Sequence, residues 1–417
     1  MEQTQINISK WLKITLINFL VVAIAGIVLR YKINFPMAIL DQKNLLHGHS
    51  HFAFTGWVTL ALMALMVGYL TKKEVKTNYK KYHLLLIFNL ITAYGMLIAF
   101  IAQGYAIFSI TFSTLSILVS YAFIFFFWRD LRKISDEPHI RNWFKTALIL
   151  LAISSVGAFT LAYLMAANIK VQEYYFSAVY FFLHFQYNGW FLFACFGLLF
   201  FYLNIKNNDA LIKLSNQLLL VMGLCVGPTY LLSILWLKLP VYVYSLASFS
   251  GIIQLLSVFY LIRLFKIIKS NHPFPRFAGS YLWFLAGVCL ILKIILQALS
   301  AVPYLGSFAF GLRPVVIAYL HLCFLGIISF FIIGCIDRLF PYRQKLSRPG
   351  ILIFAIGVIV QEILLMIQGI EIMTLSFVPH INILLFAAAV TIGSGLALIA
   401  FKSGSIKKPT RVKTLVG

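Results

Sequence analysis

Three copies of one short motif, each in a strongly apolar segment, decide how this chain folds. Each copy begins with a histidine, continues with Phe or Leu, and carries a glycine five residues after the histidine: His51-Phe-Ala-Phe-Thr-Gly56-Trp57, His184-Phe-Gln-Tyr-Asn-Gly189-Trp190 and His321-Leu-Cys-Phe-Leu-Gly326-Ile327. An ionisable ring inside a membrane segment is costly without a partner, so each histidine is a candidate functional residue. The copies lie four hydrophobic segments apart, which predicts an internal repeat with a shared ligand site.

The composition around these motifs is that of a membrane protein. Of 417 residues, 62% are hydrophobic and only 11% are charged, and the mean hydropathy is +0.94. Apolar runs longer than the roughly 18 residues needed to span a bilayer follow one another along the chain. We expect a single all-α membrane domain over residues 1–417 with twelve spans, at about 11–29, 46–70, 84–102, 106–128, 143–165, 174–203, 214–236, 240–265, 279–299, 313–335, 350–370 and 376–401.

The formal charge of +23 is distributed in a way that predicts topology and not nucleic-acid binding. Lys and Arg number 5, 5, 2, 4, 4 and 5 in the loops 71–82, 129–145, 204–213, 263–276 and 338–348 and the tail 402–413, whereas the intervening loops carry few. This is the positive-inside pattern, so we expect both termini in the cytoplasm and a multi-pass protein of the cell membrane. The expected partner of the basic surface is the lipid bilayer, with no nucleic acid.

With this topology, even-numbered spans begin at the outer surface. His51 then lies near the outer end of the second span, His184 about ten residues into the sixth, and His321 about eight residues into the tenth, at a rise of about 1.5 Å per residue. His380 opens the twelfth span. All four rings are therefore predicted in the outer half of the membrane.

The second span opens with the cluster His47-Gly-His49-Ser-His51. His47 and His51 are one turn apart and share a face, whereas His49 points about 200° away around the helix axis. The three rings therefore cannot bind one ion from a regular helix, and we expect one to face the bundle interior. A purely structural role, such as a hydrogen bond to a backbone carbonyl or to lipid headgroups, remains the alternative for each histidine taken singly.

Twelve spans with histidines on the second, sixth and tenth resemble subunit I of the heme–copper oxidase superfamily, in particular its short nitric oxide reductase-like and cbb3-like members. The resemblance covers nearly the whole chain and implies three four-helix arcs with pseudo-threefold symmetry. It implies one low-spin, bis-histidine heme held by His51, with His49 as second choice, and by His321. It also makes Arg313, at the outer mouth of the tenth span, a candidate partner of a heme propionate.

The second metal centre of the family is incomplete in this sequence. The family holds a copper ion with one histidine on the sixth span and two on the seventh, and here the sixth span offers His184 while the seventh, around Cys225 and Pro228, offers none. His380 is the candidate that joins His184 in a remnant of that metal site. Imidazole binds both iron and copper, so the residues leave the identity of a second metal open.

The resemblance implies a heme-binding membrane protein engaged in redox chemistry, electron transfer or sensing of a diatomic gas, with an electron-donor or cytochrome c-type partner subunit. If it is an enzyme, it is an oxidoreductase of the terminal oxidase or nitric oxide reductase type. Two alternatives come from other classes. Twelve spans and polar groups near mid-membrane also occur in secondary transporters, although their halves repeat by six spans. The second alternative is a metal- or heme-handling protein with His47 and its neighbours as an entry site.

Overall fold

The computed structural model describes residues 6–237, 239–271, 279–306, 312–339 and 345–401, and every regular element in these ranges is a helix. Several helices begin at a side-chain cap; for example, the Asp41 carboxylate accepts a hydrogen bond from the Asn44 backbone N–H at 2.8 Å. The elements are α1 (Ile8–Asn34), α2 (Gln42–Phe52), η1 (Ala53–Thr59), α3 (Leu60–Lys72), α4 (Tyr79–Gln103), α5 (Ile107–Leu131), α6 (Pro138–Ala166), α7 (Gln172–His184), η2 (Phe185–Phe191), α8 (Leu192–Tyr202), η3 (Ile205–Asn207), α9 (Asp209–Val226), η4 (Pro228–Ile234), α10 (Val241–Gln254), α11 (Leu256–Asn271), α12 (Ser280–Leu299), α14 (Arg313–His321), η5 (Leu322–Ser329), α15 (Phe330–Leu339), α16 (Arg348–Thr374) and α17 (Ile381–Phe401).

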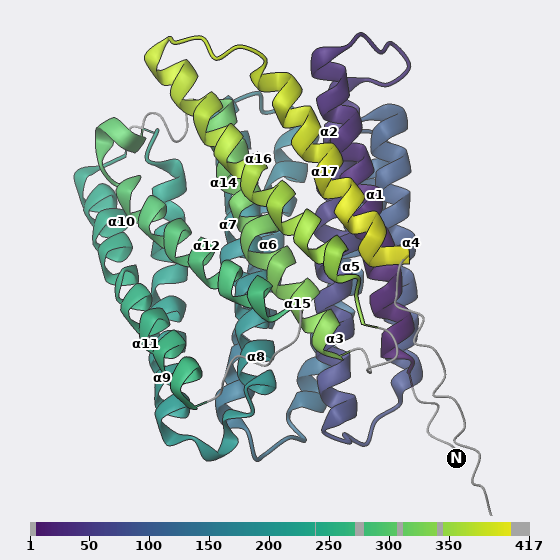
Figure 1. Cartoon of the computed structure of the whole chain (residues 1–417), viewed down its shortest axis with the longest axis vertical. Helices are drawn as coiled ribbons and strands as arrows, with labels where there is room; N and C mark the ends of the chain where they lie inside the picture. Colours follow the sequence, from purple (N-terminus) through teal and green to yellow (C-terminus); the bar gives the residue numbers. More distant parts are fainter. Residues whose placement is uncertain (1–5, 238, 272–278, 307–311, 340–344, 402–417) are drawn as a thin grey trace, which may run out of the picture.

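The chain is an all-α, multi-pass membrane protein whose long helices run side by side in one bundle (Figure 1). Within the described ranges, 11 helices are long and apolar enough to cross a membrane, and each coincides with one of the predicted spans. The remaining predicted span, 174–203, corresponds to α7, η2 and α8, whose middle carries the polar residues Gln186 and Asn188. The basic tail 402–413 lies outside the described residues.

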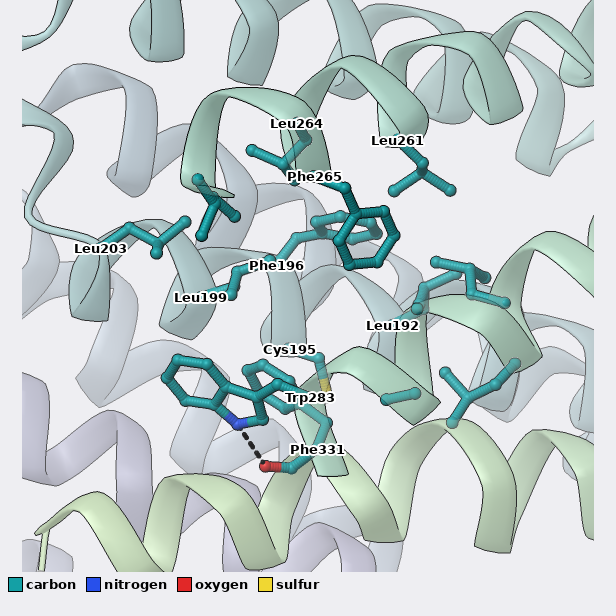
Figure 2. A pocket seen from close by; sticks show the side chains of 15 residues that line it. Leu192, Cys195, Phe196, Leu199, Leu203, Leu261, Leu264, Phe265, Trp283 and Phe331 are labelled. Carbon is teal, nitrogen blue, oxygen red and sulfur yellow. Dashed lines mark hydrogen bonds between the residues drawn. The ribbon is translucent and has the colours of Figure 1, made fainter. Parts of the chain in front are cut away.

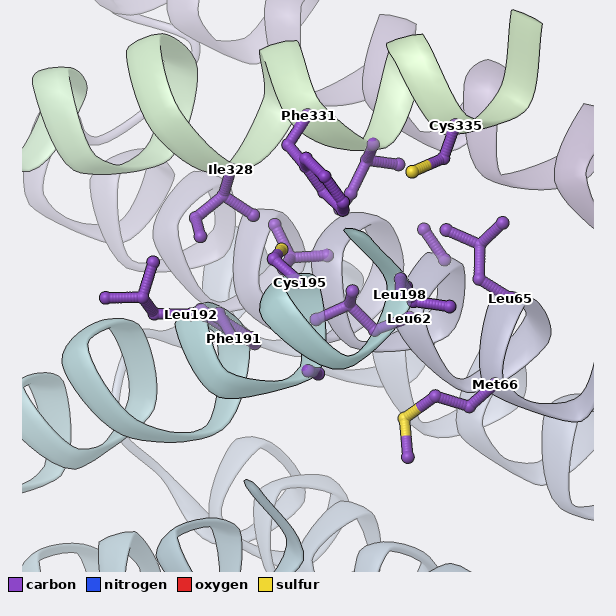
Figure 3. Close-up of a cluster of buried hydrophobic side chains, with 14 of the residues drawn as sticks. Leu62, Leu65, Met66, Phe191, Leu192, Cys195, Leu198, Ile328, Phe331 and Cys335 are labelled. Carbon is purple, nitrogen blue, oxygen red and sulfur yellow. The ribbon is translucent and has the colours of Figure 1, made fainter. Parts of the chain in front are cut away.

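The core is built where the segments that follow the three histidine motifs meet. Figure 3 shows Leu62 and Leu65 of α3 facing Leu198 of α8, with Phe331 and Cys335 of α15 above them. All five side chains are buried in one hydrophobic cluster. Segments that are apolar on every side have no solvent or lipid face to prefer, so they take the centre of the bundle.

Buried carboxylates hold the loops together at the predicted cytoplasmic end of the bundle. Asp130 at the end of α5 is fully buried and lies 2.5 Å from the Lys81 ammonium and 2.9 Å from that of Lys133. It also accepts hydrogen bonds from Thr77 and Tyr82. Each of these donors stabilises the carboxylate, so this cluster fixes the start of α4 against the end of α5.

A small cavity of about 70 Å³ lies between α8, α11, α12 and α15 (Figure 2). Its walls are apolar, including Phe196, Leu264 and Leu290, and the Trp283 indole donates its hydrogen bond to the Phe331 carbonyl at 3.1 Å. No histidine lines it. The motif histidines therefore lie elsewhere in the bundle.

Candidate functional site

A π-helix begins within two residues of each motif histidine. These π-helices are η1 in the first motif, η2 in the second and η5 in the third. The π-helix is rare, occurs mostly as single turns inside α-helices, and is frequent at functional sites. Because a π-helix occurs at the equivalent place in all three motifs, the repeat in the sequence is also a repeat in backbone conformation.

In η1 the irregular backbone is stabilised by side chains of neighbouring helices. Asn18 of α1 donates a hydrogen bond to the Gly56 carbonyl at 2.7 Å, and Asn89 of α4 donates one to the Thr55 carbonyl at 3.0 Å. Both asparagines are buried. Carbonyls that lie outside the regular hydrogen-bond ladder need such partners inside a membrane.

The glycines of the second and third motifs allow close approach of a neighbouring helix. A Cβ at Gly189 would lie 2.9 Å from Leu150 Cβ of α6, and one at Gly326 would lie 3.0 Å from Cys289 Sγ of α12. The motif glycine is therefore a site of close packing at these two positions.

One cavity of about 260 Å³ brings two histidines together. It lies between α1, α2, α14, η5, α16 and α17, and both His49 and His321 line it. Apolar side chains such as Phe54 and Phe324 form most of its wall, and Arg30 and Gln361 add polar groups. We call this space the histidine cavity.

The hydrogen bonds of these two rings leave the same nitrogen available on each. His49 Nδ1 lies 3.1 Å from the Val22 carbonyl oxygen, and His321 Nδ1 lies 2.9 Å from that of Ile317. A carbonyl oxygen only accepts, so Nδ1 must carry the proton in both rings. Nε2 is then a free lone pair, which is the arrangement that a metal-ligating histidine adopts.

The walls of the histidine cavity are shaped around these rings. A Cβ at Gly26 of α1 would lie 3.3 Å from His49 Cε1, so this position has little room for a side chain. On the far wall, Trp57 stacks on Phe19 with ring centroids 4.3 Å apart and donates to Ser329 Oγ at 2.9 Å. This bond joins the first motif directly to η5, the π-helix of the third motif.

His51 faces away from the histidine cavity. Its ring stacks on Phe100 of α4 at 4.3 Å between centroids, and its Nε2 lies 3.2 Å from the Tyr105 hydroxyl. His47 lies on the same side, 4.7 Å from the Tyr105 ring. The predicted division of the cluster into two faces is thus confirmed, and the face directed at His321 is that of His49.

His184 is fully buried and both of its ring nitrogens have protein partners. Nε2 donates to the Val226 carbonyl at 2.7 Å, and Nδ1 accepts from the Asn188 amide at 3.1 Å. No lone pair remains for a metal in this arrangement. The residues present therefore do not fit a copper ion held by His184.

The other predicted site residues lie apart from one another. His380 is exposed, has a φ of +62° and directly precedes α17. Arg313 is exposed at the start of α14 and does not line the histidine cavity. Across the described ranges, no group of three or more His, Cys, Asp or Glu side chains is placed to hold a metal ion.

Arg30 is the cavity residue that sequence reasoning missed. Arg30 directly follows the predicted first span, 11–29, and so falls among the few cations of the predicted outer loops. The structure continues α1 to Asn34, which carries Arg30 into the wall of the histidine cavity. Its guanidinium is the cation available to an anionic group there.

Comparison with solved structures places this fold beside an oxidase. The chain is similar to a heme-copper terminal oxidase whose dimer was determined by cryo-EM, with a TM-score of 0.68 and 13% sequence identity over 97% of this chain and 86% of that chain. No protein-family model and no curated protein matches. The protein therefore has the fold of heme–copper oxidase subunit I, and the predicted fold resemblance is confirmed.

Proposed function

We propose that this protein binds one low-spin heme in the histidine cavity, with His49 and His321 as its two axial ligands, and that it transfers electrons in the membrane. One observation carries the proposal: two rings on one apolar cavity each use Nδ1 for a backbone carbonyl and leave Nε2 free. The similar solved structure is described as a heme-copper terminal oxidase, which supports heme as the ligand.

The residues of the cavity fit this group by their chemistry. The apolar walls exclude water, Gly26 leaves space beside the His49 ring, and the Arg30 guanidinium is suited to a propionate. Bound between two imidazoles, the heme would accept and release single electrons. Arg30 thus takes the role that the resemblance had assigned to Arg313.

Electron transfer is favoured over oxygen reduction because of what surrounds the second motif. Reduction of oxygen to water needs a second redox centre beside the substrate, and the His184 nitrogens are both engaged. A heme held by both His49 and His321 would also leave a diatomic gas no open position on the iron. A cytochrome c-type subunit remains the predicted electron partner.

We further propose that the three π-helices mark a pseudo-threefold arrangement of four-helix arcs and that α7, η2 and α8 form the sixth of twelve spans. Three equivalent motifs, each followed by a π-helix and then by a core segment, support this reading. A transporter built from two six-span halves gains no support from this spacing.

The test is the optical spectrum of purified protein, oxidised and reduced, with a pyridine hemochrome assay. We expect sharp reduced α and β bands in the wild type. Loss of a residue that only supports a metal ligand lowers metal affinity by about tenfold to hundredfold. His49→Ala and His321→Ala each remove a ligand itself, so we expect a larger loss of heme affinity and a clear fall in heme content. His51→Ala is the matched control, two residues along α2 but on its other face, and should keep its heme.

Two results would overturn the proposal. Heme loss in His51→Ala together with heme retention in His49→Ala would move the axial position to the other face of α2. A featureless spectrum from folded wild-type protein, expressed with ample heme, would remove the heme altogether. Size-exclusion elution and circular dichroism of each variant separate loss of heme from loss of fold.

A further inference from the structure

A second cavity of about 380 Å³ lies on the opposite side of α14 from the histidine cavity. Leu320 lines both spaces and so forms part of the wall between them. The second cavity is bounded by α7, η2, α12, α14 and α16. No histidine lines it, so it offers heme no imidazole ligand.

The outer wall of the second cavity faces the lipid. Leu292 and Leu299 of α12 and Met366 of α16 line the cavity and are 47%, 44% and 48% exposed on the surface of the bundle. A molecule dissolved in the bilayer therefore meets this wall first. An apolar body or tail is compatible with it.

The inner wall carries a hydrogen-bond donor, the Gln297 amide, whose orientation is fixed by the buried cation Lys293. Lys293 is only 1% exposed, and its ammonium donates to Gln297 Oε1, one turn along α12. Because that oxygen is occupied by Lys293, the Gln297 side chain has its NH₂ group left to offer to the cavity that it lines. A ligand that accepts a hydrogen bond satisfies this group.

The same cavity also presents an acceptor without a partner. Glu362, in the middle of α16, lines the cavity, and its Oε1 is buried with no hydrogen-bond partner. An unpartnered carboxyl within a membrane is expensive, so a donor at this position is strongly favoured. The ligand head must therefore both donate and accept.

Two aromatic rings line the same cavity as these polar groups. Tyr187 of η2 and Tyr319 of α14 both line the cavity, with ring centroids 6.2 Å apart and planes at 73°. Such an edge-to-face pair accepts a further planar ring well. An anionic head is disfavoured by Glu362, and a cationic head by Lys293 at the base of the same wall.

We propose that this second cavity binds a membrane-dissolved phenolic lipid. Its hydroxyl donates to the Glu362 carboxyl oxygen Oε1 and accepts from the Gln297 amide, its ring packs against Tyr187 and Tyr319, and its alkyl tail leaves through the apolar wall. This inference does not depend on the heme, since the two cavities have separate polar groups.

The test is equilibrium binding of tritiated para-heptylphenol to the full chain in nanodiscs, in competition with two analogues. Para-heptylanisole keeps the acceptor oxygen but has no hydroxyl proton, and heptylbenzene has neither. Loss of one hydrogen bond to a buried polar group should weaken binding about tenfold. We therefore expect para-heptylanisole to bind about tenfold more weakly than para-heptylphenol, and heptylbenzene to bind more weakly than para-heptylanisole. Equal competition by heptylbenzene would overturn the proposal, since only apolar filling would then remain.

Variants give a second, independent readout. Glu362→Leu and Gln297→Leu should each weaken para-heptylphenol binding by about tenfold, and Gln254→Leu, a buried glutamine of α10 outside this cavity, is the matched control. Unchanged binding in Glu362→Leu and Gln297→Leu would also overturn the proposal. His321→Ala should lose heme and keep phenol binding, so the failure of either proposal can be recognised separately.

Discussion

The two halves of the bundle differ in how closely their side chains are packed. In the predicted cytoplasmic half, α3, α8 and α15 interlock so closely that Leu62 and Leu198 are completely buried, and loops are tied by buried carboxylates. In the predicted outer half, the helices α2, α7 and α14, which precede them in the chain, border two cavities of about 260 and 380 Å³. The packed half supplies rigidity, and the hollow half is where bound molecules belong.

The largest effect on stability is expected at the buried carboxylate of the packed half. Asp130→Ala leaves the Lys81 ammonium buried without its counter-ion, which we expect to lower the free energy of unfolding by about 3 kcal/mol or more. Titration with sodium dodecyl sulfate in mixed micelles measures this. Asp130→Asn keeps hydrogen-bond acceptors for Thr77 and Tyr82 and should lie between alanine and wild type; equal stability of all three proteins would contradict the prediction.

Leucine truncation compares the two halves directly. Leu62→Ala opens a hole in close packing and should cost roughly 2 kcal/mol, while Leu320→Ala, whose side chain already borders both cavities, should cost less than about 1 kcal/mol. The same micelle titration applies. If both substitutions cost the same, the outer half is as tightly packed as the inner half.

The smallest effect is expected at the surface. Lys206 and Asp136 form an exposed loop pair at 2.9 Å, and the Lys206 ammonium lowers the pKa of the Asp136 carboxyl. A lowered folded pKa adds stability above the unfolded value of about 4 and loses it as the pH falls below that value. Lys206→Ala should therefore leave the unfolding midpoint at pH 7 nearly unchanged, and any difference from wild type should vanish in acid.

The sequence predicted the spans well because each is a long apolar run, which leaves few structural choices in a membrane. It also divided the histidine cluster correctly, since helical geometry alone sets His49 opposite His47 and His51. Which face meets the interior was beyond it, because that depends on α1 packing on one side of α2 and α4 on the other.

Other parts of the site were hidden for similar reasons. The engagement of His184 Nε2 depends on Val226, a residue 42 positions away in the chain, while Nδ1 is engaged by Asn188 only four positions away. Lys293 and Glu362 are ionisable residues within two of the predicted spans. That Glu362 and Gln297, the partner of Lys293, line one cavity depends on three-dimensional packing. The π-helices have no residue signature beyond the motif itself, so only the repeat pointed to those positions.

The π-helix in each motif also allows the outer and inner parts of one helix to be oriented separately. Each π-helix acts as an inserted residue, and one residue in an α-helix corresponds to a rotation of about 100°. The outer part of the helix can therefore be turned relative to the inner part without disturbing the core. Deleting one residue from η1 would rotate His49 out of its cavity while leaving α3 in register. The inserted residue therefore sets the direction of each histidine ring without changing the packing of the core.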